Sequence, residues 1–149
     1  MSRAFRCILC LLPALFLLTG WHAYAQEMVS VSGNEVNLRS GPGTKYPPDW
    51  ILDRGYPLRI LRNQGAWLKV IDFENDTGWI HRSLTSSTPY HIVKVKGANM
   101  RSRPSVNSRI VAKLVYGEVL KTLEHSGGWV RLQRDGLRGW VAKRLLWGW

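Results

Sequence analysis

Apolar and polar residues alternate over short stretches along most of the chain, and turn-forming residues separate these stretches. The first two run from Met28 to Val31 and from Val36 to Leu38, and later ones include Pro57 to Leu61 and Trp67 to Val70. Alternation with a period of two is typical of half-buried strands. Since no segment keeps a helical period for more than a few turns, the pattern predicts an all-β protein.

The same pattern occurs twice. The heptapeptide NLRSGPG of Asn37 to Gly43 returns as NMRSRPS at Asn99 to Ser105, an offset of 62 residues. This offset also pairs Trp67 with Trp129, and an offset of 61 pairs Trp79 with Trp140. An internal repeat of this length indicates one small structural unit per copy. We therefore predict two domains, residues 26–86 and 87–149, joined by the linker-like segment TSSTP at residues 85–89.

Within each unit, the residues after the heptapeptide predict a long loop. In the first copy it spans Ser40 to Trp50 and cannot be helical, because it holds three prolines. Its counterpart, Ser105 to Val111, lacks the double glycine and double proline. We expect the loop to differ in shape between the copies, and we expect one helical turn at His81 to Leu84.

The 8 tryptophans are many for a chain of this size. We expect Trp67, Trp79, Trp129 and Trp140 to occupy core or half-core positions and to fill two small cores as large apolar bodies. Loss of such a ring should unfold mainly its own repeat. The two tryptophans at 147 and 149 either cap the second domain or protrude from it.

Residues 1–25 have the features of a secretory signal peptide. The apolar run is shorter than the roughly 20 residues that span a bilayer. The segment comprises Arg3 and Arg6, the apolar run Cys7 to Leu18, and the small-residue ending Ala23-Tyr24-Ala25. We expect cleavage near Ala25 and a periplasmic or secreted protein. The remaining chain has no cysteine, so it offers no disulfide and no thiolate.

Positive charge is concentrated in the second copy. Residues 26–86 carry 7 Lys+Arg and 7 Asp+Glu, whereas residues 87–149 carry 12 and 3, a net charge of +9. Such a surface either keeps the protein soluble or attaches it to an anionic envelope surface, such as peptidoglycan carboxylates or lipid headgroups. Nucleic acid would suit the charge but not an exported location.

Four sequence pieces occur in the same order in both copies and resemble a known family. They are NLRSGPG, a glycine before an alternating strand, GAWLKV and TGWI in the first copy, and NMRSRPS, YGEVLKTL, GGWVRL and RGWVAKRLL in the second. Together they resemble two tandem bacterial SH3-like domains. The resemblance implies two small, partly open β-barrels of five or six strands. It also implies an exported module that attaches to peptidoglycan or to an envelope protein, often beside a hydrolase domain, and no hydrolase domain is visible in this sequence.

Six residues are candidates for ligand binding. Arg39 and Arg101 alternate with apolar neighbours, so they point off the core and either pack over a tryptophan or meet an anionic ligand. Tyr46 and Trp50 on the first long loop would form an aromatic platform if both are exposed. The second copy adds the cations Arg103 and Arg109.

The inventory for catalysis is thin. His81, His91 and His125 are isolated from acidic partners, and no metal-spaced histidine pair or nucleophile motif is visible. We expect no catalytic residue, metal or cofactor. The sequence therefore favours a non-enzymatic binding or scaffold protein that recognises peptidoglycan or an envelope protein. The alternative is an enzyme, or an inhibitor or regulator of cell-wall hydrolases.

Overall fold

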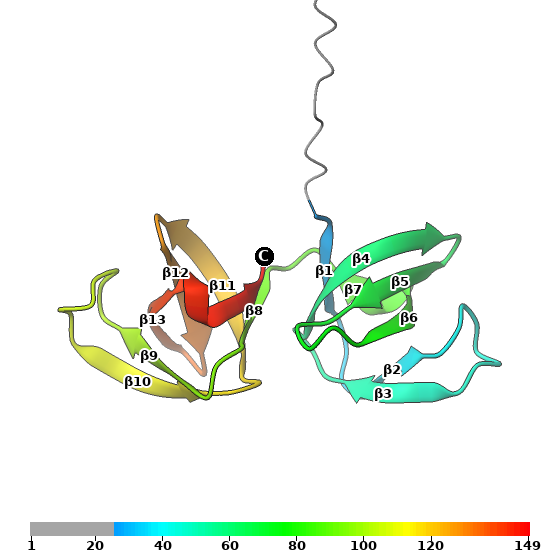
Figure 1. The fold of residues 1–149 in the computed structure, drawn as a ribbon, viewed down its shortest axis with the longest axis horizontal. Coiled ribbons are helices and arrows are strands. Elements are labelled where there is room, and N and C mark those ends of the chain that lie inside the picture. Colours follow the sequence, from blue (N-terminus) through cyan, green and yellow to red (C-terminus); the bar gives the residue numbers. More distant parts are fainter. Residues whose placement is uncertain (1–25) are drawn as a thin grey trace, which may run out of the picture.

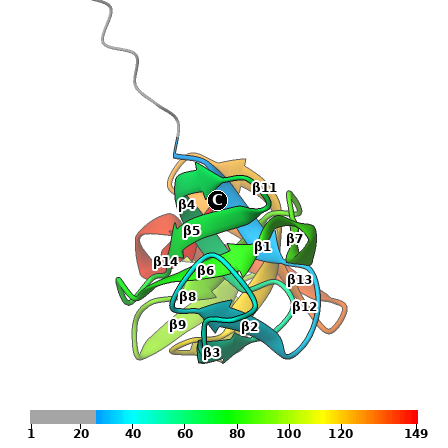
Figure 2. The same cartoon turned by 90° about the vertical axis from the view of Figure 1, so that its right-hand side faces the viewer.

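The computed structural model describes residues 26–149, and the predicted signal peptide lies outside the described residues. Two domains of short strands, repeat one and repeat two, lie next to each other (Figure 1). Viewed along the long axis, repeat one stands in front of repeat two (Figure 2). No helix in the described part of the chain is both long enough and apolar enough to cross a bilayer. The prediction of an all-β chain with two tandem barrels is confirmed.

The two repeats have the same strand order. In repeat one the sheet runs β3-β2-β6-β5-β4-β1-β7, and in repeat two β10-β9-β13-β12-β11-β8-β14. Repeat one comprises β1 (Met28–Val31), β2 (Val36–Arg39), β3 (Pro48–Leu52), β4 (Pro57–Gln64), β5 (Trp67–Ile71), β6 (Thr77–His81), the 3₁₀ turn η1 (Arg82–Leu84) and β7 (Thr85–Ser86). Repeat two comprises β8 (Tyr90–Val93), β9 (Gly97–Arg101), β10 (Ile110–Val115), β11 (Val119–Ser126), β12 (Trp129–Arg134), β13 (Leu137–Ala142), η2 (Lys143–Leu145) and β14 (Leu146–Gly148).

Each sheet has seven strands instead of the five or six that the family resemblance implied. The additional strand follows the 3₁₀ turn, where β7 pairs with β1 and β14 pairs with β8. Thr85 and Ser86 therefore belong to the barrel of repeat one, although their composition suggested a linker. The connection between the repeats is residues 87–89.

The two cores are built from the same positions. Each of the eight buried core residues of repeat one has a counterpart in the core of repeat two, at an offset of 62, or of 61 after the one-residue deletion. The pairs are Val31 and Val93, Val36 and Ala98, Leu38 and Met100, Leu52 and Leu114, Leu58 and Leu120, Leu68 and Val130, Val70 and Leu132, and Ile80 and Val141.

The four repeated tryptophans occupy core or half-core positions, as expected, although neither aliphatic core cluster contains a tryptophan. Trp79 is buried, whereas Trp67, Trp129 and Trp140 are half-buried. The aliphatic side chains form the two core clusters, and the larger rings lie at the margin. The glycine before Trp79 shows how tight this margin is, because a Cβ at Gly78 would lie 2.4 Å from Leu38 Cγ.

The two long loops, residues 40–47 and 102–109, have the same backbone conformation, contrary to the expectation. Ser40 N bonds Pro47 O, Gly43 N bonds Gly41 O and Tyr46 N bonds Gly43 O. Repeat two has the counterparts of all three at an offset of 62: Ser102 N to Arg109 O, Ser105 N to Arg103 O, and Ser108 N to Ser105 O. The loss of glycine and proline in repeat two therefore leaves the hydrogen bonding of the loop unchanged.

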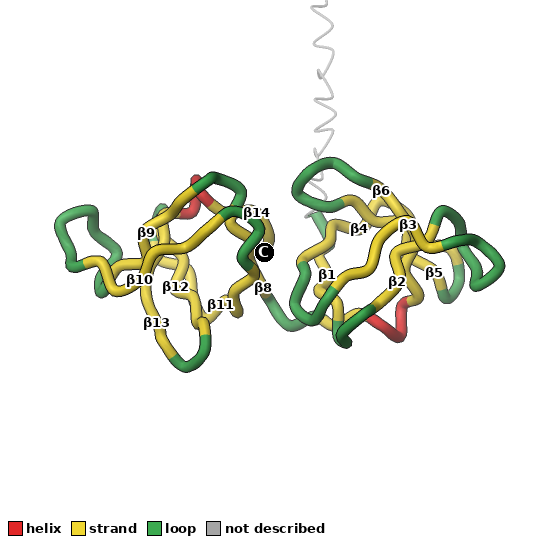
Figure 3. The backbone as a smooth tube through the Cα atoms, turned by 90° about the horizontal axis from the view of Figure 1, so that it is seen from below, coloured by secondary structure: helices red, strands yellow, loops and turns green. Residues whose placement is uncertain are grey.

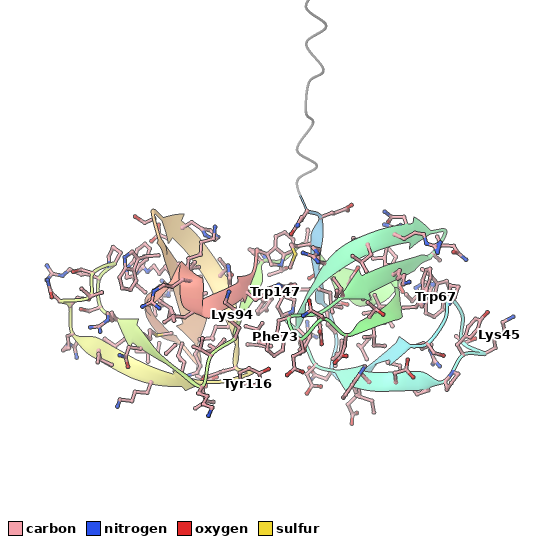
Figure 4. All side chains as sticks on the ribbon, viewed as in Figure 1. Lys45, Trp67, Phe73, Lys94, Tyr116 and Trp147 are labelled. Atoms are coloured by element: carbon pink, nitrogen blue, oxygen red, sulfur yellow. The ribbon has the colours of Figure 1, made fainter. Side chains whose placement is uncertain are left out.

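Side chains from both repeats meet at a junction between the barrels. The rings of Phe73 and Tyr116 lie 5.4 Å apart, and the Tyr116 hydroxyl donates to a carboxylate oxygen of Glu74. Figure 4 shows Phe73 and Tyr116 facing each other between the barrels. On another side of the junction, Trp149 Nε1 donates to Ser30 Oγ at 3.1 Å. Trp149 therefore contacts repeat one and does not simply cap repeat two.

Candidate functional site: two equivalent pockets

Each repeat has one pocket at the same place in the fold. Pocket one has a volume of about 370 Å³ and is lined by Asn34, Glu35, Val36, Asn37, Arg39, Thr44, Trp67, His81, Ser83 and Leu84. Pocket two has a volume of about 240 Å³ and is lined by Gly97, Ala98, Asn99, Arg101, Val106, Trp129, Ala142, Arg144 and Leu145. Every residue of pocket two is the counterpart of a residue of pocket one. The repeat therefore preserves a concave surface as well as a core.

Three elements position the lining of each pocket. The strand after the first turn, β2 or β9, supplies an asparagine and an arginine, and β5 or β12 begins with the tryptophan. The 3₁₀ turn closes the end. In Figure 4, Trp67 lies beside the long loop whose tip carries Lys45. Figure 3 shows the two 3₁₀ turns on opposite sides of the long axis.

The ring of Trp67 forms one wall of pocket one. Across the β5–β6 ladder it pairs with His81, and the two rings meet edge to face with centroids 5.2 Å apart. In repeat two the same register pairs Trp129 with Ala142. Trp129 consequently lacks the imidazole contact, and the two pockets differ in their polar groups although their frames match.

Arg39 and Arg101 hold the long loops. Arg39 Nη1 donates to the carbonyl oxygen of Tyr46 at 2.8 Å, and Arg101 Nη1 donates to that of Ser108, also at 2.8 Å. In the sheet register, Arg39 lies opposite Trp79 and Arg101 opposite Trp140. Each arginine thus combines a structural bond with a place in the pocket wall.

The structure separates the two aromatic residues proposed as a platform. The ring of Tyr46 is half-buried against its own loop, where a Cβ at Gly41 would lie 2.5 Å from it. Trp50 is 53% exposed on β3 and lines neither pocket. The platform required both rings to be exposed, and only Trp50 meets that condition.

Arg103 and Arg109 lie on the second long loop and are exposed, but they do not line pocket two. Of the six candidate residues, the pockets therefore contain Arg39 and Arg101. Sequence reasoning missed Glu35, Ser83 and Arg144. These positions lie beside the recurring motifs but change identity between the copies, so the repeat drew no attention to them.

A histidine and a serine meet in pocket one. His81 Nδ1 lies 2.7 Å from Ser83 Oγ and also accepts the Ser83 backbone N–H at 3.3 Å. Because Nδ1 accepts from the backbone, the ring proton belongs on Nε2. A hydrolytic triad needs a third group that orients the base, and among residues 26–149 no carboxylate is hydrogen-bonded to His81. The pair caps the 3₁₀ turn.

Three carboxylates gather in the β5–β6 turn, those of Asp72, Glu74 and Asp76. The Asp72 carboxylate accepts the backbone N–H of Glu74 and of Asp76, both at 2.9 Å, and the hydroxyl of Tyr56 at 3.2 Å. Burial and the Asp72 charge raise the pKa of Tyr56, so its hydroxyl stays a donor. These bonds give Asp72 a structural role, because it closes the turn as an Asx cap.

Sequence comparison agrees with this architecture. Residues 32–87 and residues 96–146 each match a bacterial SH3 domain family. The chain belongs to the bacterial SH3 domain family. It carries two such domains in tandem, as the motifs implied, with one matched range over repeat one and the other over repeat two.

The chain is also similar in sequence to a protein named as an amidase. The chain is 26% identical over 140 residues to the putative N-acetylmuramoyl-L-alanine amidase YrvJ of Bacillus subtilis (strain 168). The match covers 82% of this chain and 27% of the amidase, so the chain spans about a quarter of that protein.

The structure was also compared with solved structures, which it matches over part of their length. NlpC2 from Trichomonas vaginalis shares 17% identity at a TM-score of 0.37, over 83% of this chain and 48% of that one. An NlpC/P60 family protein from Bacillus cereus ATCC 10987 shares 13% identity at a TM-score of 0.35, over 83% of this chain and 56% of that one.

Proposed function

We propose that this protein binds peptidoglycan outside the cytoplasm through pockets one and two, and that it acts as a binding or scaffold protein without hydrolytic turnover. The observation that carries the proposal is the repetition of the pocket. The asparagine, arginine and tryptophan that line pocket one recur at the same places in pocket two.

The chemistry of these three groups suits a peptide. An asparagine amide and the free N–H groups of an arginine bond peptide carbonyl and carboxylate oxygens, while an indole ring covers apolar side chains. Peptidoglycan stem peptides offer all of these groups. The name of the relative, a putative N-acetylmuramoyl-L-alanine amidase, and the predicted signal peptide support the same location and ligand class.

The pockets serve two separate ligand segments. The 3₁₀ turns that line them lie on opposite sides of the long axis (Figure 3), and the pockets share no residue, so we expect each pocket to bind its own ligand segment. Joining two weak sites in one chain raises the apparent affinity for a polymer, provided that both sites engage it. A sacculus presents many stem peptides and satisfies this requirement.

Co-sedimentation with purified sacculi tests the binding. The double variant Trp67→Ala and Trp129→Ala should lose most of the bound fraction, since both pocket walls are removed. Trp50→Ala is the matched control, because it removes an exposed tryptophan outside both pockets. Loss of binding in Trp50→Ala with retention in the double variant would overturn the assignment to the pockets.

A second measurement tests the absence of turnover. Purified protein incubated with sacculi should release no soluble muropeptides. Release that is lost in His81→Ala or Ser83→Ala would instead support the enzyme alternative, because these residues form the only histidine–hydroxyl pair that lines a pocket in the described residues.

A further inference from the structure

The two pockets have the same frame but different charges, because pocket one has one cation and one anion, whereas pocket two has two cations. Where pocket one has Ser83, pocket two has Arg144, and where pocket one has the carboxylate of Glu35, pocket two has Gly97. The imidazole of pocket one is replaced by Ala142. Pocket two therefore gains a cation and loses an anion at equivalent places.

The rims differ in the same direction. The asparagine of pocket one, Asn37, pairs across the β2–β3 ladder with Ile51, which is 66% exposed. The asparagine of pocket two, Asn99, pairs with Lys113, which is also exposed. A ligand that lies along this edge meets an apolar side chain at pocket one and an ammonium group at pocket two.

The cations of pocket two have no acidic partner within the described residues. The two ion pairs found among residues 26–149 join Arg131 to Glu124 and Arg134 to Glu118. Repeat two has 3 acidic residues, and these pairs use two of them. Arg101 uses one N–H group on its own loop and Arg144 is exposed, so their guanidinium groups retain donors for a ligand.

We propose that pocket two selects the carboxylate of an acidic peptide, whereas pocket one takes peptide without a preference for a carboxylate. This inference rests on the proposed function and names the ligand chemistry of each pocket. A guanidinium binds a carboxylate with two parallel, charge-assisted hydrogen bonds. At pocket one Glu35 brings a negative charge, which disfavours a ligand carboxylate, and Ser83 lies where pocket two has Arg144.

Each pocket contains its own spectroscopic reporter. The indole N–H signals of Trp67 and Trp129 can be followed separately by NMR during titration of the full chain, with assignment from Trp67→Phe and Trp129→Phe. The probes are N-acetyl-Ala-Glu, with two free carboxylates, and its diamide, which is uncharged. We expect the Trp129 signal to report about tenfold tighter binding of the acid than of the diamide, a preference that high salt weakens. The Trp67 signal should report no preference for the acid.

Exchange of the two equivalent side chains is the decisive variant pair. Arg144→Ser should abolish the preference at Trp129, and Ser83→Arg should create a preference for the acid at Trp67. Both positions are exposed, and dispersed amide spectra of the variants check that they fold. Arg103→Ser is the matched control, since it removes an exposed guanidinium of the same repeat outside the pocket.

Three outcomes would overturn the inference. These are an equal preference at both indoles, a preference at Trp129 that survives Arg144→Ser, and no response of either indole to the acid. In each case the co-sedimentation result of the double tryptophan variant stands by itself. Failure of the charge selection is thus distinguished from failure of peptidoglycan binding.

Discussion

The long loops of the two repeats have the same backbone hydrogen bonds but different interiors. In repeat one the ring of Tyr46 lies against Gly41 and Gly43. In repeat two the equivalent residue is Ser108, whose buried hydroxyl oxygen lies 2.8 and 2.7 Å from the carbonyl oxygens of Arg103 and Ser105, so its one proton is shared between two acceptors. The first loop encloses an aromatic ring, whereas the second encloses a serine hydroxyl that is hydrogen-bonded to the loop backbone.

This difference shows what determines the loop. The features common to both copies are the backbone bonds and the arginine that donates to the carbonyl of residue 46 or 108. The side chain inside the loop is exchangeable, provided that it satisfies or covers the enclosed backbone groups. Glycine at 41 is needed where a ring approaches the backbone, whereas arginine is accommodated at the equivalent position 103, beside a serine.

The largest effects are expected in the cores, where the repeats are most alike. Leu58 and Leu120 are equivalent and fully buried. Replacement of either by alanine removes the same contacts and leaves a cavity, at a cost of about 2–5 kcal/mol in the free energy of unfolding. Urea denaturation measures both. The matched controls are Leu61→Ala and Leu123→Ala, two exposed positions three residues further along each strand. Costs at 58 and 120 no larger than those of the controls would contradict the equivalence of the cores.

A second effect distinguishes the repeats, because His91 in repeat two occupies the position of Val29 in repeat one. Burial, and then the nearby His125, lowers the pKa of His91 to about 4. The unfolded chain, with an ordinary histidine pKa of about 6.5, binds the proton more readily than the folded chain. Stability should therefore be fully present above about pH 6.5 and fall as the pH drops toward 4, by about 2 kcal/mol at pH 5.

Urea denaturation of wild type and His91→Val at about pH 7.5 and pH 5 measures this loss. The variant carries the aliphatic side chain type of repeat one and should lose most of the pH dependence. His125→Ala serves as the comparison, because the pKa of His125 is also lowered, by burial and then by Lys143. If the free energy of unfolding of His91→Val depends on pH as steeply as that of the wild type, another group causes the pH dependence.

The third effect concerns the arginines that hold the loops. Arg39→Met and Arg101→Met keep the aliphatic stem and remove the donor to the loop carbonyl, so each should cost about 1.5 kcal/mol. Hydrogen exchange should accelerate at the loop amides of the altered repeat, and the loop of the other repeat provides an internal control. Equal protection of both loops in either variant would show that the arginine does not hold the loop.

Much of the fold could be predicted because the strand residues recur in both copies of the repeat. Alternation identified most strands, and the recurrence of Asn37, Arg39 and Trp67 placed the two barrels and their family. The tryptophans were correctly expected at core or half-core positions, but hydrophobicity alone does not distinguish a core position from its margin. The aliphatic residues around them already fill a small barrel, which leaves a ring of this size half-buried at the edge.

The pockets could be predicted only in part, for a different reason. Their shared residues recur and were visible, whereas Ser83 and Arg144 come to line the pockets only because the 3₁₀ turns fold against the start of β5 and β12. The preserved shape of the long loop was also hidden, because backbone hydrogen bonds leave no residue pattern when several side chains can satisfy them. Similarly, the contact of Trp149 with Ser30 depends on tertiary structure across 119 residues of chain.

The smallest expected effect tests whether the two repeats unfold independently of each other. Trp149 of repeat two donates to Ser30, which is fully buried in repeat one.

Trp149→Phe keeps most of the ring and removes the donor, so it should cost about 1 kcal/mol in the free energy of unfolding, the usual contribution of one hydrogen bond. Trp147→Phe is the matched control, because no hydrogen bond of its indole N–H is found among the described residues. Tryptophan fluorescence during urea denaturation measures the coupling. If the junction couples the repeats, the wild-type protein should unfold in one transition, and Trp149→Phe should broaden or split that transition. Two transitions already present in the wild type, unchanged by the variant, would show that each barrel unfolds by itself, as the sequence alone suggested.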